Sequence, residues 1–192
     1  GDRSYPTAAI GSYLDWVTLM AYDLHGTWES TPTANHTALY DNTTQQIATI
    51  HYGVEQWLNA SLPPLSALLG LAAYGYTWVL ENPALHGVGA PTLNSDSSPT
   101  FSDIQSDVSA ANGTCAVDKT TVSAYCYWTL VSQNTTIWAG FDDPITIGAK
   151  VQYLFEKRLR GYSFWSIDGD VHNLLYKRGD LPMLSSHLFL IM

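Results

Sequence analysis

Residues suited to binding a polar ligand follow an apolar run near the start of the chain. Residues 17–22, Val-Thr-Leu-Met-Ala-Tyr, are mostly apolar on both faces and lead into Asp23 and a Leu-His-Gly segment. This pattern predicts a buried strand that stops at a loop. Strands that are apolar on both faces belong to parallel sheets covered on both sides, which carry their sites at the carboxyl ends of the strands. Asp23 is therefore expected at a binding site.

The residues around Asp23 also match a known motif. Met20-Ala-Tyr22-Asp23 resembles the Met-x-Tyr-Asp motif on the sixth barrel strand of family 18 glycoside hydrolases, the chitinase family. Residues 67–76 resemble the seventh strand of that family. Ala72 and Ala73 replace the usual Pro and Phe, so less aromatic surface is expected there for binding the substrate. The likeness is to the plant class V chitinases and their chitinase-like relatives.

A third segment completes the resemblance in chain order. Residues 161–170 resemble the eighth strand, Gly-x-x-x-Trp-x-x-x-x-Asp, whose Trp165 would form the floor of the sugar site. The polar stretch 79–143 is similar to the α+β subdomain that many family members insert between strands seven and eight. The resemblance implies an α/β fold, the C-terminal part of a (β/α)8 TIM barrel (strands 6–8) with an inserted α+β subdomain.

Helices are expected on both sides of the insertion. Apolar residues at helical spacing predict a helix over residues 47–58, stopped by Pro63 and Pro64. A longer helix over residues 144–160 begins after Asp143 as N-cap and ends at Gly161. The expected units are a barrel part (1–78), the insertion (79–143), a second barrel part (144–180) and a tail (181–192).

The resemblance assigns roles to the site residues. Tyr22 would hydrogen-bond the acetamido group of the substrate, and Asp23 would orient that group or the sugar. Met20 would line the pocket floor and Trp165 would stack under the sugar, whereas the alternative makes these two residues ordinary barrel core. The full set of substrate-binding candidates is Met20, Tyr22, Asp23, Tyr74, Tyr76, Asp142 and Trp165.

The acid that the family uses for catalysis is missing from the sequence. In family 18 a Glu within an Asp-x-x-Asp-x-Asp-x-Glu motif protonates the leaving oxygen while the acetamido group of the substrate attacks. No such motif occurs here, and Asp168-Gly-Asp170, the one Asp-x-Asp, has no Glu two residues later. We interpret that segment as a turn at a strand end. The chain is therefore predicted not to hydrolyse chitin by itself, and no catalytic residue is assigned.

Composition excludes several other functions. Hydrophobic residues make up 46% and charged residues 13% of the 192 residues, which is typical of a globular domain. The net charge of −9 and scattered basic residues argue against nucleic-acid binding and against a polybasic membrane signal. Histidines lack metal-ligand spacing and no glycine-rich phosphate loop occurs. No metal, cofactor or membrane segment is predicted, and the apolar run at the end of the tail is too short to span a bilayer.

Several features favour the secretory pathway and an extracellular location. The sequence begins at Gly1 without Met or a signal peptide, which indicates a fragment or a processed chain. Cys115 and Cys126, at a spacing that suits two strands of a hairpin, would pair in a secreted chain or remain as two buried thiols. The candidate glycosylation sites are Asn35, Asn42, Asn59, Asn112 and Asn134.

Three functions are compatible with these observations. The chain is part of a secreted chitinase, a non-catalytic lectin or receptor ectodomain that binds chitin or N-acetylglucosamine oligomers, or a nonfunctional product of a truncated gene. The barrel strands counted here are too few to close a barrel. We therefore expect exposed edges on the first and last strands, and a marginally stable isolated chain.

Overall fold

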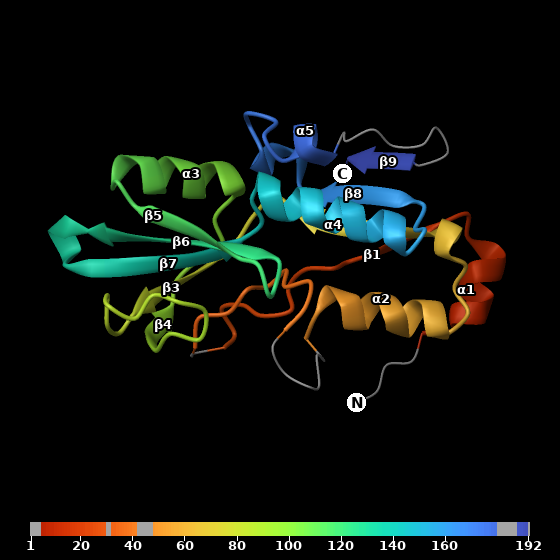
Figure 1. Cartoon of the computed structure of the whole chain (residues 1–192), viewed down its shortest axis with the longest axis horizontal. Helices are drawn as coiled ribbons and strands as arrows, with labels where there is room; N and C mark the ends of the chain where they lie inside the picture. Colours follow the sequence, from red (N-terminus) through yellow and green to blue (C-terminus); the bar gives the residue numbers. More distant parts are fainter. Residues whose placement is uncertain (1–4, 30–31, 42–47, 180–187, 192) are drawn as a thin grey trace.

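The computed structural model of the chain describes residues 5–29, 32–41, 48–179 and 188–191. The elements form two sheets that lie end to end along the long axis of the molecule (Figure 1). The chain passes from one sheet to the other at residues 73–75 and again at residues 142–160, and the first of these crossings carries Tyr74, part of the candidate site.

The first sheet has four parallel strands. In order across the sheet they are β1 (Val17–Leu19), β2 (Ala67–Ala72), β8 (Gly161–Trp165) and β9 (Leu188–Ile191). Every described residue of β2 is buried, as expected for a parallel strand that is covered on both faces. The predicted order of three neighbouring parallel barrel strands is therefore present as β1, β2 and β8.

The first strand is shorter than predicted. Pairing with β2 ends at Leu19, so residues 20–22 of the expected strand lie beyond the sheet. Gly70 of β2 allows this segment to pass close to the neighbouring strand, because a Cβ atom at Gly70 would lie 2.7 Å from the Leu19 carbonyl oxygen and 3.0 Å from the Tyr22 ring. Met20, in this segment beyond the sheet, is 72% exposed.

The edge of β8 is also different from the expectation. The last strand was predicted to lack a neighbour, but β9 pairs with β8 in parallel along its length, from Gly161 to Phe164. The residues of β9 read Leu-Phe-Leu-Ile, a composition with high strand propensity. Among the described strands, β1 pairs on one side alone, so the predicted exposed edge remains there.

Helices cover the parallel sheet. The elements are α1 (Thr7–Tyr13), α2 (Ile50–Asn59), α4 (Pro144–Glu156) and α5 (Tyr176–Gly179). The helix α4 begins as predicted, with Asp143 as N-cap in a capping box and Pro144 in the first turn. Its buried residues Ile147, Val151 and Leu154 belong to the same core cluster as Leu69 of β2 and Phe164 of β8. None of the helices in the described part of the chain has the length and apolar character that a membrane span requires.

The second sheet is antiparallel and has five strands. Across the sheet the order is β4 (Thr92–Ser95), β3 (Tyr76–Leu80), β7 (Thr135–Phe141), β6 (Ser123–Leu130) and β5 (Thr114–Asp118). The helix α3 (Phe101–Ala110) lies along one side of this sheet in Figure 1. The described residues also form three short 3-10 turns, at Pro64–Ser66, Val131–Gln133 and Ile167–Gly169.

Both faces of the antiparallel sheet are covered. Phe101 and Ile104 of α3 join the main core, which continues into the parallel sheet. Trp78 and Trp138 are fully buried on the other face and form a smaller cluster. The division of the chain at residue 79 stays a prediction, and the pairing of β3 with β7 places residues 76–78 in the antiparallel sheet.

Candidate functional site

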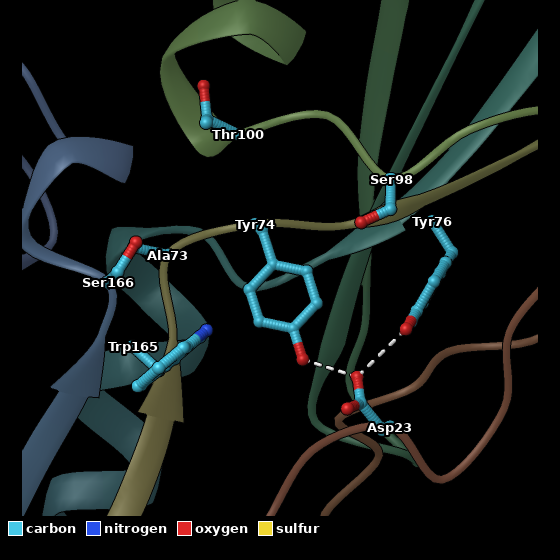
Figure 2. Close-up of a pocket in the computed structure, with 8 residues that line it drawn as sticks. All are labelled: Asp23, Ala73, Tyr74, Tyr76, Ser98, Thr100, Trp165 and Ser166. Atoms are coloured by element: carbon cyan, nitrogen blue, oxygen red, sulfur yellow. Dashed lines mark hydrogen bonds between the residues drawn. The ribbon is translucent and has the colours of Figure 1, made fainter.

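Asp23 is the centre of a polar cluster beyond the end of β1. Its backbone has a φ of 59°, a left-handed conformation that Asp adopts more readily than most residues. Its carboxylate accepts hydrogen bonds from the hydroxyls of Tyr74 and Tyr76, the second at 3.0 Å. Figure 2 shows both phenol rings converging on this one carboxylate oxygen.

The two tyrosines lie where the chain passes from the parallel sheet to the antiparallel sheet. Tyr74 follows β2, and Tyr76 is the first residue of β3. Burial, together with the hydrogen bond to Asp23, raises the pKa of Tyr76 to about 12 and raises the pKa of Tyr74 still further. Both phenols therefore stay protonated and act as donors to Asp23 at any physiological pH.

A pocket of about 330 Å³ opens beside this cluster. Trp165, the last residue of β8, is 52% exposed and contributes its indole to the wall. Hydroxyl side chains come from the segment between β4 and α3 and from the residue after Trp165. The lining residues, drawn in Figure 2, are Asp23, Ala73, Tyr74, Tyr76, Ser98, Thr100, Trp165 and Ser166. The pocket thus combines carboxylate and hydroxyl groups with one exposed aromatic plane.

Two candidates from the motif lie next to the pocket and are not among its lining residues. The ring of Tyr22 meets the ring of Tyr74 edge to face, at 6.1 Å between centroids. Burial and the nearby Asp23 charge raise the pKa of Tyr22. Met20 lines a separate, smaller pocket of about 90 Å³ between β1 and α2. Neither Met20 nor Trp165 is buried in this chain, unlike residues of an ordinary core.

Asp142 is placed outside the pocket. It is 1% exposed, directly after β7, and its carboxylate accepts hydrogen bonds from the ammonium of Lys150 and from the hydroxyl of Thr146. Lys150 also donates to the carbonyl oxygen of Thr37. Burial raises the pKa of Asp142 and lowers that of Lys150, while their attraction opposes both shifts. This buried pair joins the end of the antiparallel sheet to the helix that covers the parallel sheet.

The Asp-x-Asp segment forms a turn, as interpreted from the sequence. The carboxylate of Asp168 accepts a hydrogen bond from the Ser166 hydroxyl. The buried carboxylate of Asp170 accepts from the backbone N–H groups of three residues that lead into α5, namely Leu174, Leu175 and Tyr176. In the part of the chain that the structure describes, no group of three or more His, Cys, Asp or Glu side chains is arranged to hold a metal ion.

The predicted modification sites differ in exposure. Asn35 is 3% exposed and its side-chain amide donates to the Ser123 hydroxyl at 2.7 Å, so a glycan at this position would conflict with the folded structure. The other sites are at Asn59, Asn112 and Asn134, which are exposed, and at Asn42, which lies outside the described residues. Cys115 and Cys126 form a disulfide between opposite positions of β5 and β6.

Two residues near the site were not found from the sequence. Trp28 is 60% exposed, and its ring lies 5.5 Å from that of Tyr76, edge to face. An aromatic residue soon after a strand-end Asp is a signal that could have identified it. His36 is fully buried under Tyr74 and Tyr76 and comes from a polar loop in which no sequence signal distinguishes it.

Comparisons with known proteins show which family the sequence is similar to. The sequence model of glycosyl hydrolases family 18 matches residues 1–170. A class V chitinase of Medicago truncatula is 36% identical over 174 residues, which cover 88% of this chain and 43% of the relative. A class V chitinase of Arabidopsis thaliana is 35% identical over 170 residues, with 86% and 43% covered.

Solved structures give the same result. A family 18 chitinase from Cycas revoluta in complex with (GlcNAc)3 superposes with a TM-score of 0.82 at 38% identity, covering 91% of this chain and 48% of that one. A chitinase-like agglutinin from Robinia pseudoacacia has a TM-score of 0.80 at 30% identity, with 91% and 49% covered. The chain therefore spans about half the length of the proteins it matches.

Proposed function

Because this chain belongs to glycosyl hydrolase family 18, we propose that it is the part of a barrel domain that holds N-acetylglucosamine oligomers, and that it does not cut them by itself. The proposal rests on one observation, the pocket. It contains the Asp23 carboxylate, which accepts hydrogen bonds from Tyr74 and Tyr76, and the exposed indole of Trp165. This pocket lies at the carboxyl ends of parallel strands, where barrel proteins bind their ligands.

The chemistry of the pocket suits an N-acetylated sugar. A sugar ring has polar hydroxyls at its edge and an apolar face, and the half-exposed indole of Trp165 offers a flat surface to that face. The second carboxylate oxygen of Asp23 would accept a hydrogen bond from the N–H of the acetamido group or from a sugar hydroxyl. The Ser98 hydroxyl of the pocket would donate to or accept from the remaining polar groups, whereas the hydroxyls of Thr100 and Ser166, which donate to Asp103 and Asp168, would act as acceptors.

The absence of turnover follows from the missing general acid. Glycoside hydrolysis needs a protonated carboxyl at the leaving oxygen, and general acid catalysis contributes roughly 10²- to 10⁴-fold to a rate. No Asp-x-x-Asp-x-Asp-x-Glu motif occurs in the sequence, and no glutamate is among the described residues that line the pocket. A longer parent protein that supplies the motif would be an enzyme, and one that lacks it would be a lectin.

A binding role is in keeping with one of the similar structures, which is a chitinase-like agglutinin. A secretory location is part of the proposal. It is supported by the disulfide between Cys115 and Cys126, which is typical of oxidising compartments, and by the exposed sequons.

The proposal is tested with the purified chain, calorimetric titration of chitin oligomers and a fluorogenic chitotriose assay. We expect measurable binding and no turnover. The Trp165→Ala variant should lose binding because the surface under the sugar is removed. Trp16→Ala is the matched control, since Trp16 is 40% exposed just before β1 and stacks on Arg160 at the other end of the sheet. Turnover by the purified chain, or equal binding by a folded Trp165→Ala variant, would contradict the proposal.

A further inference from the structure

His36 is a buried residue that contacts several residues of the candidate site. Its side chain is fully buried, and its Nδ1 atom accepts a hydrogen bond from the backbone N–H of Asp23 at 3.4 Å. Its Nε2 atom lies 3.1 Å from the carbonyl oxygen of Tyr74, which can only accept, so Nε2 carries the proton and donates. The two bonds together select one neutral tautomer of the imidazole.

The ring and the backbone of His36 add further contacts to the same residues. The ring centroid lies 4.8 Å from that of Tyr74 and 5.1 Å from that of Tyr76, the second in an edge-to-face arrangement. The carbonyl oxygen of His36 accepts from the N–H of Leu24 at 3.1 Å. One buried residue therefore contacts the turn that presents the carboxylate and both phenols that hold it.

The backbone of Asp23 explains why this support matters. Its φ of 59° goes together with a carboxylate directed to the two tyrosine hydroxyls, and even Asp, which tolerates this left-handed conformation better than most residues, adopts it less often than an extended one. The hydrogen bond from the Asp23 N–H to His36 helps to hold this conformation. Without it, the N–H group would be left without this acceptor beside a buried ring, and a more extended conformation would move the carboxylate away from the phenols.

We propose that His36 is a positioning residue for oligosaccharide binding, which it serves by holding Asp23 and Tyr74 in the geometry of the pocket. The proposal rests on the proposed function, because the ligand is the one assigned there. Burial, and secondarily the charge of Lys150, lowers the pKa of His36 to about 3, so the neutral tautomer that makes both bonds persists at physiological pH.

Three substitutions separate the contributions of His36. His36→Asn keeps an acceptor near the position of Nδ1 and so retains the bond to Asp23. His36→Gln places an amide near Nε2 and retains the bond to Tyr74. His36→Phe keeps a ring against the tyrosines and removes both bonds. We expect about a tenfold higher Kd for chitin oligomers in the Gln variant, which lacks the bond to Asp23 and so loses one hydrogen bond. The Asn variant, which lacks only the bond to Tyr74, should lose less affinity, and the Phe variant, which lacks both bonds, should lose the most.

The matched control is His51→Phe. His51 is hydrogen-bonded to the Tyr153 hydroxyl at 3.1 Å, in contact with α4 and away from the pocket. It should lower stability without changing Kd. Folding of each variant is checked by near-UV circular dichroism. Equal affinity of a folded His36→Phe variant, or an Asn variant that loses as much affinity as the Phe variant, would overturn the positioning role.

A spectroscopic measurement distinguishes the positioning role of His36 from the proposed function. Nitrogen chemical shifts of the imidazole in the wild-type chain should show the neutral tautomer protonated at Nε2, and the three-bond coupling of the Asp23 amide should report a positive φ that changes in His36→Phe. A chain that shows these signals but binds no oligomer would refute the proposed function alone. A wild-type His36 with the proton on Nδ1 would refute the positioning role even if binding were intact.

Discussion

The two sheets of this protein are built in different ways. In the antiparallel sheet, β5, β6 and β7 are joined by short connections, and a disulfide links β5 to β6. In the parallel sheet, β1 pairs with β2 and β2 pairs with β8 across long intervening segments, and β1 leaves one edge without a described neighbour. The antiparallel sheet therefore rests largely on local contacts, whereas the parallel sheet depends on contacts between distant parts of the chain.

The candidate site lies between these two kinds of structure. Asp23 follows a strand of the parallel sheet, Tyr76 begins a strand of the antiparallel sheet, and Tyr74 lies on the segment between them. A change that separates the sheets should therefore damage the site more than a change within the antiparallel sheet. The four predictions below test this difference.

The largest effect is expected from the buried pair between the sheets. Lys150→Met leaves the Asp142 carboxylate buried without its cation, and such a loss costs about 3–5 kcal/mol in free energy of unfolding. Urea unfolding measures it. The double variant Lys150→Met/Asp142→Leu serves as control, because removing both charges should restore much of the loss. A change below about 1 kcal/mol in the single variant would show that the pair contributes little to holding the sheets together.

Removal of the disulfide should affect one sheet alone. The Cys115→Ser/Cys126→Ala variant opens a loop with a sequence separation of 11 residues, and loop-closure entropy predicts a loss of about 2–3 kcal/mol. Oligomer affinity should stay unchanged because neither cysteine contacts the pocket. A lower affinity in the folded variant would mean that the antiparallel sheet supports the site more directly than its contacts indicate.

Acid should weaken the region around His36. The unfolded histidine has a pKa near 6.5, whereas burial lowers the folded value to about 3. Between these values the unfolded chain binds a proton that the folded chain does not, so the free energy of unfolding falls by up to about 1.4 kcal/mol per pH unit as the pH decreases. Above pH 6.5 the histidine is neutral in both states, and protonation of His36 takes nothing from the free energy of unfolding.

The part of this pH dependence that belongs to His36 is measured by comparing the free energy of unfolding of the wild-type chain and of His36→Asn as a function of pH. The ionisable groups acting on the ring are Asp23, whose carboxylate lies 3.8 Å from Nδ1, together with Lys150 and His25. These groups remain in the variant, so the difference between the two pH profiles of unfolding belongs to His36. Parallel profiles from pH 7 to pH 5 would contradict a buried neutral histidine.

The smallest effects are expected at two helix N-caps, one for each sheet. Asp143 caps α4 beside the parallel sheet and accepts from the N–H groups of Ile145 and Thr146, and Thr100 caps α3 beside the antiparallel sheet. Substitution by Ala should cost about 1 kcal/mol at each, and more at Asp143, whose charge also faces the helix dipole. Thermal unfolding compares them. Ser98→Ala is the control, and a larger loss at Thr100 would reverse the expected order.

Much of the fold was predictable from the sequence. The match of three strand motifs in order indicated the C-terminal part of a barrel, and the comparisons confirm the family and the fold. The strand β1 is shorter than its apolar pattern suggested, because residues 20–22 pass close to β2 at Gly70 without pairing with it. The predicted open edge of β8 was wrong, since pairing between distant segments is not visible in local patterns.

The candidate site was predicted in part. Asp23, Tyr74, Tyr76 and Trp165 meet at one pocket, and their roles in sugar binding stay predictions. Asp142 is instead buried in an ion pair, which its position after an apolar strand did not reveal. A sequon does not indicate whether its asparagine is exposed, and the structure places the side chain of Asn35 inside the protein.

The sequence by itself determined the family, the strand-end position of Asp23, the capped start of α4 and the absence of the catalytic acid motif. These features depend on residues close together in the chain, where periodicity, capping and motif spacing act. The tertiary structure alone decided that Tyr74 and Tyr76, 51 and 53 residues from Asp23 in sequence, share its carboxylate, and that His36 lies beneath them. Hydrogen-bond geometry between distant segments depends on how the two sheets pack, and no local pattern encodes it.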